Sequence, residues 1–405
     1  MMKRERDNGN LSVCHVYFGN VFALPIMRSE LIRSREQNIR ATVIAPRYPH
    51  EKSSGVLAFP SEGNFDHVSF HFISLLARKV TANQRADLKL IRYVEFVART
   101  LACILKTRAD VYVGHDMPAM LPVFLGCWLT GRKMIYHAHE IWSEAGTEVS
   151  PLLKFWKPVE RIVTRRADLV VVPEGNRAEI IYREFGSRKI PVVVRNVPDW
   201  KPTTRRLDLR ERIGISKEAV LVLYHGLLSP SRCLPELVDS LTWLPRNVHL
   251  VLLGSGEPAF VATLEEMGRK AGIGPRLNIL PRVPYSDIQS YISSADVGIV
   301  LYRNRGRNNY FAAPNKFYEY TFSGVPVVVS DFPGLKSLVQ EGEFGTWCDP
   351  ESPEDIARAI LNVKETGNRS ALAGRAREMF SWEKEFQHLV DAYRSVVGRR
   401  DQSGK

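Results

Sequence analysis

Short apolar runs alternate with amphipathic helical stretches along most of this chain. In the first half, runs rich in Val, Ile and Leu recur at 11–18, 41–46, 109–116, 134–140, 167–173 and 190–196. Helix-like stretches lie between them, as at 25–37 and 85–106. Short apolar runs bounded by polar residues are typical of buried strands, and their alternation with helices is typical of a parallel sheet wrapped by helices.

The same rhythm begins again after the sequence RNVPDWKPTTRR. Five further apolar runs lie at 220–226, 248–256, 276–283, 295–302 and 325–331. The sequence therefore predicts an α/β protein with two Rossmann-like domains, residues 1–198 and 199–380, joined near 197–205. Ligands of open α/β sheets bind beyond the carboxyl ends of the strands, so we expect the domains to face each other across a ligand cleft. The amphipathic segment 381–397 predicts a terminal helix.

Composition fits this organisation. The chain has 405 residues, of which 44% are hydrophobic and 25% are charged, enough for two domains with their own cores. No apolar run reaches the roughly 18 residues of a membrane span, and no export-type apolar run follows the charged start MMKRERDNGN. We therefore expect a cytoplasmic protein. The five cysteines form no CxxC pair, which predicts buried free thiols rather than a disulfide framework or a zinc site.

The formal net charge is +12, and the excess lies mainly in the first half. Residues 1–200 hold 29 Lys and Arg against 20 Asp and Glu. Such an excess favours polyanions: nucleic acid, anionic lipid or phosphorylated substrates. No motif combining aromatic and basic residues supports nucleic-acid binding, so none is expected.

One basic stripe is specific enough to carry a prediction. In PLLKFWKPVERIVTRR, four basic residues share one helical face: Lys154, Lys157, Arg161 and Arg165. A basic amphipathic helix can lie on an anionic membrane surface. The alternative is a core-packed helix with a solvated charged side, and the two interpretations are compatible.

The stretch PNKFYEYTFSGVPVVVSD predicts a helix that ends abruptly and leads into a strand. Asn315 is a good N-cap, Gly324 suits the left-handed position after the helix, and Pro326 prevents its continuation. The free N–H groups at the helix start would suit a diphosphate. Glu319 could then bind a ribose hydroxyl pair, or it could simply pair with Lys316 on a solvated face. The residues alone leave both interpretations open.

This stretch, continued as FPGL, resembles the nucleotide-sugar segment of the retaining two-domain glycosyltransferases of the GT-B fold. The resemblance is to the large group, family 4-like and group 1 in type, that builds bacterial surface glycans. In that family a Glu in E-x-M-A-x-G-x-P-V-V binds the donor ribose, which implies this role for Glu319. Many members carry a further Glu eight residues earlier, where this chain has Phe311. The loop 308–315 is then expected to contribute backbone N–H groups instead.

The resemblance implies other donor-site positions in the second half. In YHGLLSPSRCLPEL, Gly226 matches the family, Leu227 replaces an Arg, Arg232 replaces a Lys and Cys233 replaces a Gly. Arg232 and Lys316 would stabilise the leaving diphosphate, so no metal is expected. The remaining donor-binding positions that the resemblance implies are Gly254, Val283, Pro284 and Asn315.

In the first half, VGHDMPAM and MIYHAHEIWSE resemble two strand-end motifs of the same family. Strand alternation places His137 and His139 on one face and Glu140 on the other. A family His near here contacts the transferring sugar, and His139 is the residue we choose for this role. We expect these histidines to project from the strand ends towards the ligand. The acceptor-side positions implied by the resemblance are Gly19, His115 and Asp116.

Together these features predict a glycosyltransferase that uses a nucleotide-sugar, UDP-sugar in particular, and transfers to a glycan or lipid-linked acceptor with retention. No cofactor is expected beyond the donor. The terminal helix, which starts at SWE, is expected to cross back to the first domain. The protein is expected in the cytoplasm and at the inner face of the membrane. Two alternatives remain: a nucleotide-sugar epimerase of the same fold, and a catalytically silent partner subunit, which Phe311 and Leu227 favour.

Overall fold

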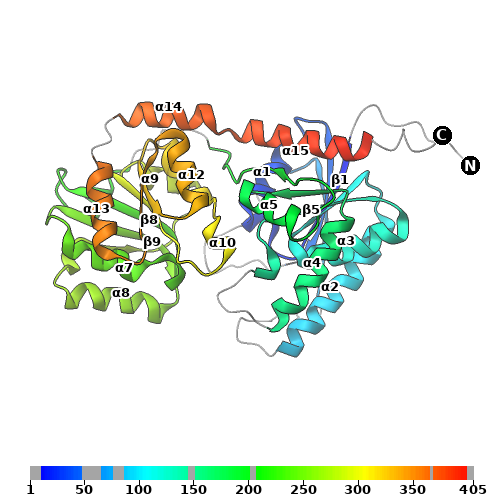
Figure 1. The fold of residues 1–405 in the computed structure, drawn as a ribbon, viewed down its shortest axis with the longest axis horizontal. Coiled ribbons are helices and arrows are strands. Elements are labelled where there is room, and N and C mark those ends of the chain that lie inside the picture. The colour runs from blue at the N-terminus through cyan, green and yellow to red at the C-terminus, as the bar shows by residue number, and fades with distance from the viewer. Residues whose placement is uncertain are drawn as a thin grey trace, which may run out of the picture. The chain divides into compact units, whose positions relative to one another are not determined.

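The computed structural model describes residues 11–47, 65–75, 86–144, 151–200, 207–364 and 368–398. The chain divides into two compact units (Figure 1). The first unit comprises residues 1–195 and 383–405, and the second comprises 196–382. The division at Arg195 lies three residues before the boundary expected from the sequence. Residues 201–206 of the expected linker lie outside the described part of the chain.

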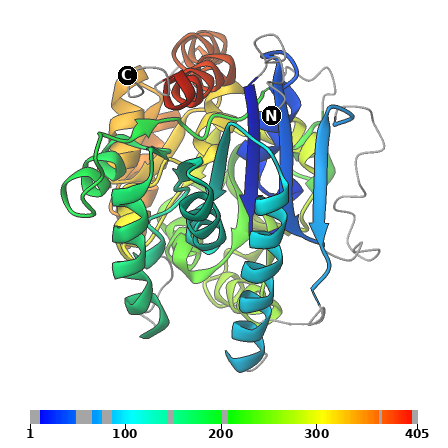
Figure 2. The same ribbon diagram turned by 90° about the vertical axis from the view of Figure 1, so that its right-hand side faces the viewer.

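The first unit is a parallel sheet with strand order β3-β2-β1-β4-β5-β6-β7. Figure 2 shows β1 to β3 side by side in blue. The strands are β1 (Leu11–Tyr17), β2 (Ile39–Pro46), β3 (Val68–Ile73), β4 (Val111–His115), β5 (Lys133–His137), β6 (Leu169–Val172) and β7 (Val192–Val193). The helices are α1 (Pro25–Arg33), α2 (Ala86–Lys106), α3 (Asp116–Thr130), α4 (Pro151–Arg166), α5 (Gly175–Arg183) and α15 (Trp382–Val397).

Successive side chains along the strands of the first unit point to opposite faces of the sheet, so apolar side chains lie on both faces. One core joins α2, α3, α4 and α5 to strand residues such as Cys14 and Tyr112, and a second joins α1 to residues of β2. Strand β3 was not expected from the sequence. It is an edge strand on which Ser69 and His71 are exposed, so it lacks the continuous apolar run of the inner strands.

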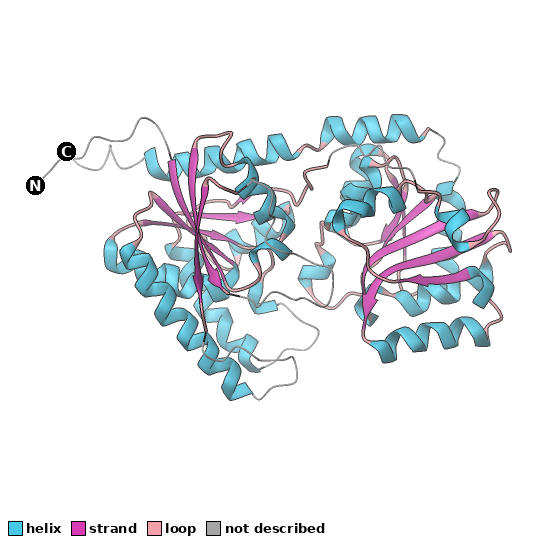
Figure 3. Cartoon of the chain, turned by 180° about the vertical axis from the view of Figure 1, so that it is seen from behind, coloured by secondary structure: helices cyan, strands magenta, loops and turns pink. Residues whose placement is uncertain are grey.

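The second unit repeats this topology with strand order β10-β9-β8-β11-β12-β13, again parallel throughout (Figure 3). The strands are β8 (Val220–Leu228), β9 (Val248–Gly256), β10 (Leu277–Leu280), β11 (Val297–Val300), β12 (Val327–Ser330) and β13 (Gly345–Cys348). The helices are α6 (Leu209–Ile213), α7 (Leu234–Ser240), α8 (Pro258–Lys270), α9 (Tyr285–Ile292), α10 (Arg307–Tyr310), α11 (Asn315–Phe322), α12 (Pro333–Gly342), α13 (Pro353–Lys364) and α14 (Arg369–Met379).

Both faces of the second sheet are covered, as a parallel sheet requires. Helices α7, α8 and α13 pack on one face, and α9, α11, α12 and α14 pack on the other. In each unit the strand order reverses direction between the first strand and the fourth, that is, between β1 and β4 and between β8 and β11. Ligands of open α/β sheets bind at such a switch point, beyond the carboxyl ends of the strands. The topology therefore marks one position in each unit.

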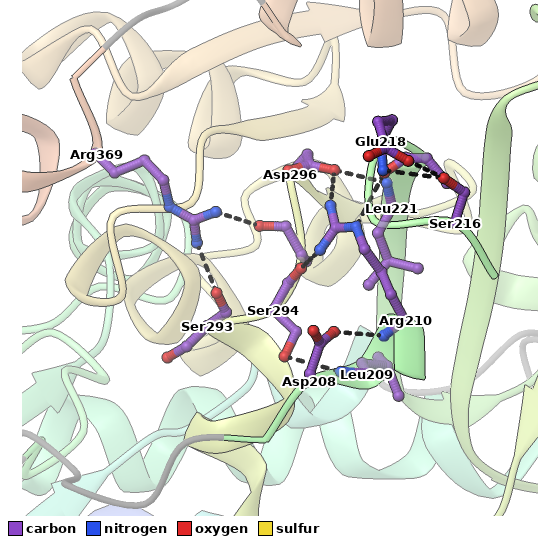
Figure 4. A network of polar contacts seen from close by, with 12 residues as sticks. Asp208, Leu209, Arg210, Ser216, Glu218, Leu221, Ser293, Ser294, Asp296 and Arg369 are labelled. Atoms are coloured by element: carbon purple, nitrogen blue, oxygen red, sulfur yellow. Dashed lines mark hydrogen bonds and ion pairs between the residues drawn. The ribbon is translucent and has the colours of Figure 1, made fainter. Parts of the chain in front are cut away.

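A polar network lies at the amino ends of the strands of the second sheet, opposite the switch point (Figure 4). Arg210 of α6 pairs with Asp296, and Asp296 also accepts a hydrogen bond from the Leu221 N–H at 2.7 Å. Arg369 donates to the carbonyls of Ala295 and Ser293 at 2.8 and 3.0 Å. The network ties α6 and α14 to the starts of β8 and β11, away from the switch point.

The terminal helix α15 begins at Trp382 and lies in the first unit from Glu383 onward. Its Glu385 accepts a hydrogen bond from the Arg195 N–H at 2.8 Å, and its Tyr393 donates to Glu30 of α1 at 2.7 Å. The last helix of the chain is therefore joined by hydrogen bonds to the first helix and to the end of residues 1–195.

Candidate functional sites

Glu319 lies inside the second unit rather than on a solvated face. The residue is only 3% exposed. One carboxylate oxygen, Oε1, accepts a hydrogen bond from the Tyr285 hydroxyl at 2.9 Å, and the other, Oε2, lies 3.3 Å from Nε2 of His225. The interpretation of Glu319 as a surface partner of Lys316 is therefore wrong, because the carboxylate faces the interior.

Helix α11, which carries Glu319, differs slightly from the expected helix. It begins at Asn315, so Pro314 occupies the N-cap and no side chain caps the helix. The expected N-cap role of Asn315 is wrong by one position, because Pro314 holds the extended backbone that precedes the first turn. The end is as expected: Gly324 has φ +71°, and a Cβ there would lie 2.3 Å from the Arg369 carbonyl oxygen.

The electrostatics around Glu319 are governed by burial. Burial raises the pKa of Glu319 to about 7, although the Tyr285 hydrogen bond and Lys316 oppose this shift. Burial, followed by the charge of Lys316, lowers the pKa of His225 to about 3. His225 is therefore neutral at neutral pH, and its contact with Glu319 is not an ion pair. The site holds an acid that needs a hydrogen-bond donor.

Two cations share the Tyr302 ring, and one of them, Lys316, interacts with this acid. The Arg232 guanidinium lies 4.0 Å from the ring centre of Tyr302, and the Lys316 ammonium lies 4.3 and 5.9 Å from the ring centres of Tyr224 and Tyr302. Nη1 of Arg232 is buried and has no hydrogen-bond partner among the residues that the structure describes. Burial and the charge of Arg232 lower the pKa of Lys316 to about 7, while Glu319 raises it. An anion placed here would relieve both the repulsion and the unpaired donor.

Two glycines let the backbone of this site close up. Gly226 and Gly254 pair across β8 and β9, and a Cβ on Gly254 would lie 1.8 Å from the Gly226 carbonyl oxygen. Gly226 has φ +127°, and a Cβ there would lie 3.3 Å from the Lys316 ammonium. Cys233, which replaces a family glycine, has φ +49°, so this chain adopts a left-handed backbone there with a side chain present.

The structure also places the other donor-binding positions predicted from the sequence, and the two positions where this chain departs from the family. Pro284 is the N-cap of α9, directly before Tyr285, and Val283 is half-buried. Leu227 is 60% exposed at the end of β8. Phe311 closes α10, and its ring packs edge-on against Tyr310 at 5.1 Å between ring centres.

In the first unit, four histidines gather at the carboxyl ends of β1, β4 and β5. Nδ1 of His15 lies 3.1 Å from Nε2 of His115, and Nδ1 of His115 lies 3.1 Å from Nε2 of His139. His137 packs against His139 with ring centres 4.4 Å apart, so the two rings lie together, although β5 ends at His137 and His139 lies beyond the strand. His15 lies 3.8 Å from Oε1 of Glu30.

The sequence predicted that these histidines all project towards a ligand, but not all of them do. His115 and His137 are 1% exposed, and both nitrogens of His115 face other imidazoles. Direct contact of His115 with an acceptor would require the ring to leave this arrangement. His139 is partly exposed, so its predicted contact with a sugar is open to it and stays a prediction.

The contacts of Asp116 and Gly19 in this structure are with neighbouring parts of the first unit. Asp116 starts α3 at φ +60°, and its carboxylate accepts a hydrogen bond from the His139 N–H at 3.0 Å. Burial, with Glu140 as the next cause, raises the pKa of Asp116 to about 7. A Cβ at Gly19 would lie 2.5 Å from Cε1 of Tyr17, so a larger residue there would require the Tyr17 ring to shift. Their acceptor-side roles stay predictions.

Two groups in this cluster could offer metal ligands: His115, His137 and His139, with ligand atoms within 4.8 Å of one another, and His15, Glu30 and His115. The ring centres of His15 and His115 are 5.4 Å apart, and those of His115 and His139 are 5.3 Å apart. In both pairs, the distance between the ring centres exceeds the distance between the facing nitrogens by about the width of one ring. The two facing nitrogens of each pair therefore point towards each other along the line that joins the ring centres. We therefore interpret the cluster as a hydrogen-bonded chain, because lone pairs that point at each other do not converge on an ion.

Several residues of both clusters were not identified from the sequence. His225 and Tyr302 belong to apolar runs that predicted strands, and Tyr285 directly follows Pro284. His15 is the polar residue inside the first apolar run, and Glu30 lies in the first helix. A histidine in an otherwise buried strand is the signal that could have drawn attention to His15 and His225.

Comparison with known proteins agrees with this architecture. The model of the family described as "Glycosyl transferases group 1" matches residues 205–379, and that of the "Glycosyl transferase 4-like domain" matches residues 30–197. The D-inositol 3-phosphate glycosyltransferase of Xylanimonas cellulosilytica is 29% identical over 258 residues, which are 60% of each chain. That of Geodermatophilus obscurus is 27% identical over 254 residues, 59% of this chain and 55% of the relative. The match thus spans about 60% of the length of these relatives.

Solved structures resemble the chain over nearly its whole length. Sucrose-phosphate synthase from Thermosynechococcus elongatus has a TM-score of 0.74 at 17% identity, with 96% of this chain and all of that chain covered. Anabaena HepE in complex with UDP and glucose has a TM-score of 0.70 at 18% identity, with 95% and 100% covered. These likenesses establish the GT-B fold of two Rossmann-like domains. With one glycosyltransferase family model on each unit, the chain belongs to the group 1 glycosyltransferases.

Proposed function

We propose that this protein transfers a sugar from a nucleotide-activated donor, a UDP-sugar, to a hydroxyl group of a glycan or lipid-linked acceptor, with retention and without a metal ion. The observation that carries this proposal is the pair of cations, Arg232 and Lys316, on shared tyrosine rings beside the buried acid Glu319. The cluster lies at the switch point of the second unit, beyond β8 and β11.

A nucleoside diphosphate satisfies each unmet requirement of that cluster. Its phosphates would pair with the unpartnered Nη1 of Arg232 and restore the full charge of Lys316. Its ribose hydroxyls would donate to Glu319, taking over or joining the hydrogen bond from Tyr285. Gly226 and Gly254 keep the strand ends free of side chains, so the backbone can approach the ligand.

In this mechanism the two cations stabilise the charge that develops on the departing diphosphate, which is the role a metal ion plays elsewhere. The departing phosphate can itself accept the proton of the acceptor hydroxyl, so a strong protein base is not required. The solved complexes of Anabaena HepE with UDP and glucose and with UDP-glucose support a nucleotide-sugar donor.

Calorimetric titration and a turnover assay test the proposal together. UDP should bind more tightly than uridine, because the phosphates contact Arg232 and Lys316. UDP release from a panel of UDP-sugars should then depend on added lipid-linked or glycan acceptors. Epimerised donor formed without an acceptor would identify an epimerase, and binding without turnover would identify a silent subunit. Equal affinity for UDP and uridine would contradict the diphosphate site.

We also propose that the first unit binds an anionic membrane surface. No described helix is long and apolar enough to cross a membrane. On α4, Arg161 and Arg165 are exposed and Lys157 is half-buried, while the side chain of Lys154 lies outside the described residues. Helix α4 runs through Pro158 without interruption, and Trp156 packs into the core. The packed face and the basic face therefore coexist on this helix.

Helix α2 of the same unit adds exposed apolar residues. Leu90, Ile91 and Val94 are 59%, 59% and 58% exposed, and Tyr93 on the same helix packs edge-on against Trp156 of α4. Basic residues near an anionic bilayer are worth roughly 1 kcal/mol each, and apolar side chains can insert among the head groups.

Sedimentation with liposomes tests this proposal. The protein should sediment with liposomes that contain anionic lipid at low salt and stay in the supernatant with neutral liposomes. Changing Lys154, Lys157, Arg161 and Arg165 to Gln should abolish the effect, whereas Arg188→Gln, away from both helices in sequence, should not. Wild-type protein that stays in the supernatant with anionic liposomes would favour a soluble acceptor.

A further inference from the structure

The imidazole chain of the first unit has a defined direction. Each of its two N···N contacts, from His15 to His115 and from His115 to His139, needs one proton. A neutral imidazole carries a single N–H, so His115 can donate in only one direction. Either all three rings are protonated on Nε2, or all three are protonated on Nδ1.

Glu30 distinguishes between these two directions. Its Oε1 accepts a hydrogen bond from the Tyr393 hydroxyl at 2.7 Å and lies 3.8 Å from Nε2 of His15. This separation is too long for a strong hydrogen bond, and burial raises the pKa of Glu30 to about 7. An oxygen that already accepts from Tyr393 still favours a proton on the nitrogen that faces it. The opposite direction would place the bare lone pair of His15 Nε2 against the acceptor oxygen. Protonation of all three rings on Nε2 is therefore favoured.

The other end of the chain is the residue predicted to contact the sugar. With Nε2 of His139 donating to His115, Nδ1 of His139 carries no proton. No hydrogen bond engages this Nδ1 within the described ranges of the chain, and His139 as a residue is half-buried, whereas His15 and His115 are buried. It can therefore accept a hydrogen bond from a ligand hydroxyl.

We propose that Glu30 and His15 are positioning residues that fix the tautomer of His139 through His115, so that His139 presents a bare Nδ1 to the substrate hydroxyl. The part that concerns catalysis rests on the proposed glycosyl transfer, whereas the tautomer itself does not. Neither residue touches the substrate. Both act through a relay that starts at Tyr393 of α15 and joins the last helix of the chain to the catalytic candidate.

The protonation states agree with this arrangement. Burial lowers the pKa of His15 to about 3, and burial together with Arg177 lowers that of His139 to about 4. The pKa of His115 is also well below its usual value, because the ring is buried beside other imidazoles. The rings are therefore neutral at pH 7, where the position of each single proton matters.

The decisive experiment is ¹⁵N NMR of histidine-labelled protein, which separates protonated from bare ring nitrogens. Substituting His139 and His15 in turn assigns the signals. Wild type should show Nε2 protonated and Nδ1 bare for His139. His15→Leu removes the acceptor of the His115 proton and should give mixed tautomers at His139. His15→Asn keeps an amide oxygen near the position of Nδ1 and should restore the wild-type pattern.

Two further variants protect this test. Glu30→Leu leaves all three rings in place but removes the acceptor, so it should also mix the tautomers. His71→Asn, at an exposed position on β3, should leave the His139 signals unchanged. A His139 that carries its proton on Nδ1 in wild type, or that keeps one pattern in both His15→Leu and Glu30→Leu, would overturn the proposal.

Turnover provides the second readout. His15→Leu should lower kcat by at least about ten-fold with little change in the donor KM, and His15→Asn should recover it, with His139→Ala as the lower limit. A purely structural role would lower stability in both His15 variants without this recovery. If wild type turns over no donor, the proposed transferase activity fails, and the NMR result still decides the tautomer.

Discussion

Replacing Glu319 by Gln should stabilise the second unit and at the same time weaken nucleotide binding. Glu319 is 3% exposed, and burial raises its pKa from 4.5 to about 7. A carboxyl whose pKa is higher in the folded state binds its proton more tightly there. The folded protein therefore loses stability as the pH rises from 4.5 to 7. Gln carries no charge and avoids this loss, while its oxygen can still accept from Tyr285.

The size of the effect follows from the shift. One pKa unit corresponds to 1.36 kcal/mol, so a shift from 4.5 to about 7 costs about 3 kcal/mol at pH 8 and about 1 kcal/mol at pH 5. These are upper values, because the amide must also fit against the neutral His225. We therefore expect Glu319→Gln to raise the free energy of unfolding of the second unit by up to about 3 kcal/mol at pH 8, and by much less at pH 5.

Guanidinium denaturation at both pH values, followed by tryptophan fluorescence, measures this change. Glu266→Gln is the matched control, because Glu266 is a solvent-exposed carboxyl of α8 in the same unit and should give no such gain. UDP titration of the same variant should show affinity reduced about ten-fold or more, because a hydrogen bond to a charged group is worth about 1.5–3 kcal/mol. A gain that is independent of pH, or equal in the Glu266 variant, would refute the burial argument. Unchanged UDP affinity would remove Glu319 from the nucleotide site.

Two further predictions concern the same unit. Arg232→Ala should weaken UDP binding by about 1.5–3 kcal/mol and leave uridine binding unchanged, because the hydrogen-bond donor that is lost would bind phosphate. Arg246→Ala is the control and should change neither affinity in the same titrations. Equal losses for both ligands would mean that Arg232 has only a structural role. Gly254→Ala should destabilise the second unit by about 1–3 kcal/mol in denaturant, because its Cβ would lie 1.8 Å from the Gly226 carbonyl oxygen. Gly374→Ala, within α14, should instead add up to about 1 kcal/mol, because no described atom outside the helix's own backbone lies within 4 Å of the new Cβ. A Gly254 variant as stable as wild type would disprove the close approach of the two strands.

Much of the fold could be predicted from the sequence, because inner strands of a parallel sheet are apolar on both faces. Each of the expected strands is present, although β7 is reduced to two residues. The expected terminal helix starts one residue late, at Trp382. The sequence did not predict β3 and β13, which are edge strands of their sheets. An edge strand packs against fewer neighbours than an inner strand, so it needs fewer apolar residues and shows no continuous apolar run.

The candidate sites depended more on tertiary structure. The motif around Glu319 identified a helix, a turn and an acid, but its residues alone could not tell a buried carboxylate from a surface ion pair. That choice was decided by β8 and α9, whose His225 and Tyr285 close over the carboxylate from 94 and 34 positions away in the chain. Burial, and with it the raised pKa, comes from packing between distant segments.

The histidines show the same division. Alternation along MIYHAHE placed His137 and His139 on one face, because strand geometry is local. Their relation to His15 and Glu30 was decided by the order of strands in the sheet, which sets β1 beside β4 and brings α1 and α15 over the same end. The chemical identities of these residues are local properties of the sequence. Their hydrogen-bond partners, their exposure and the direction of their protons come from parallel pairing of strands about 100 residues apart, which no local pattern encodes.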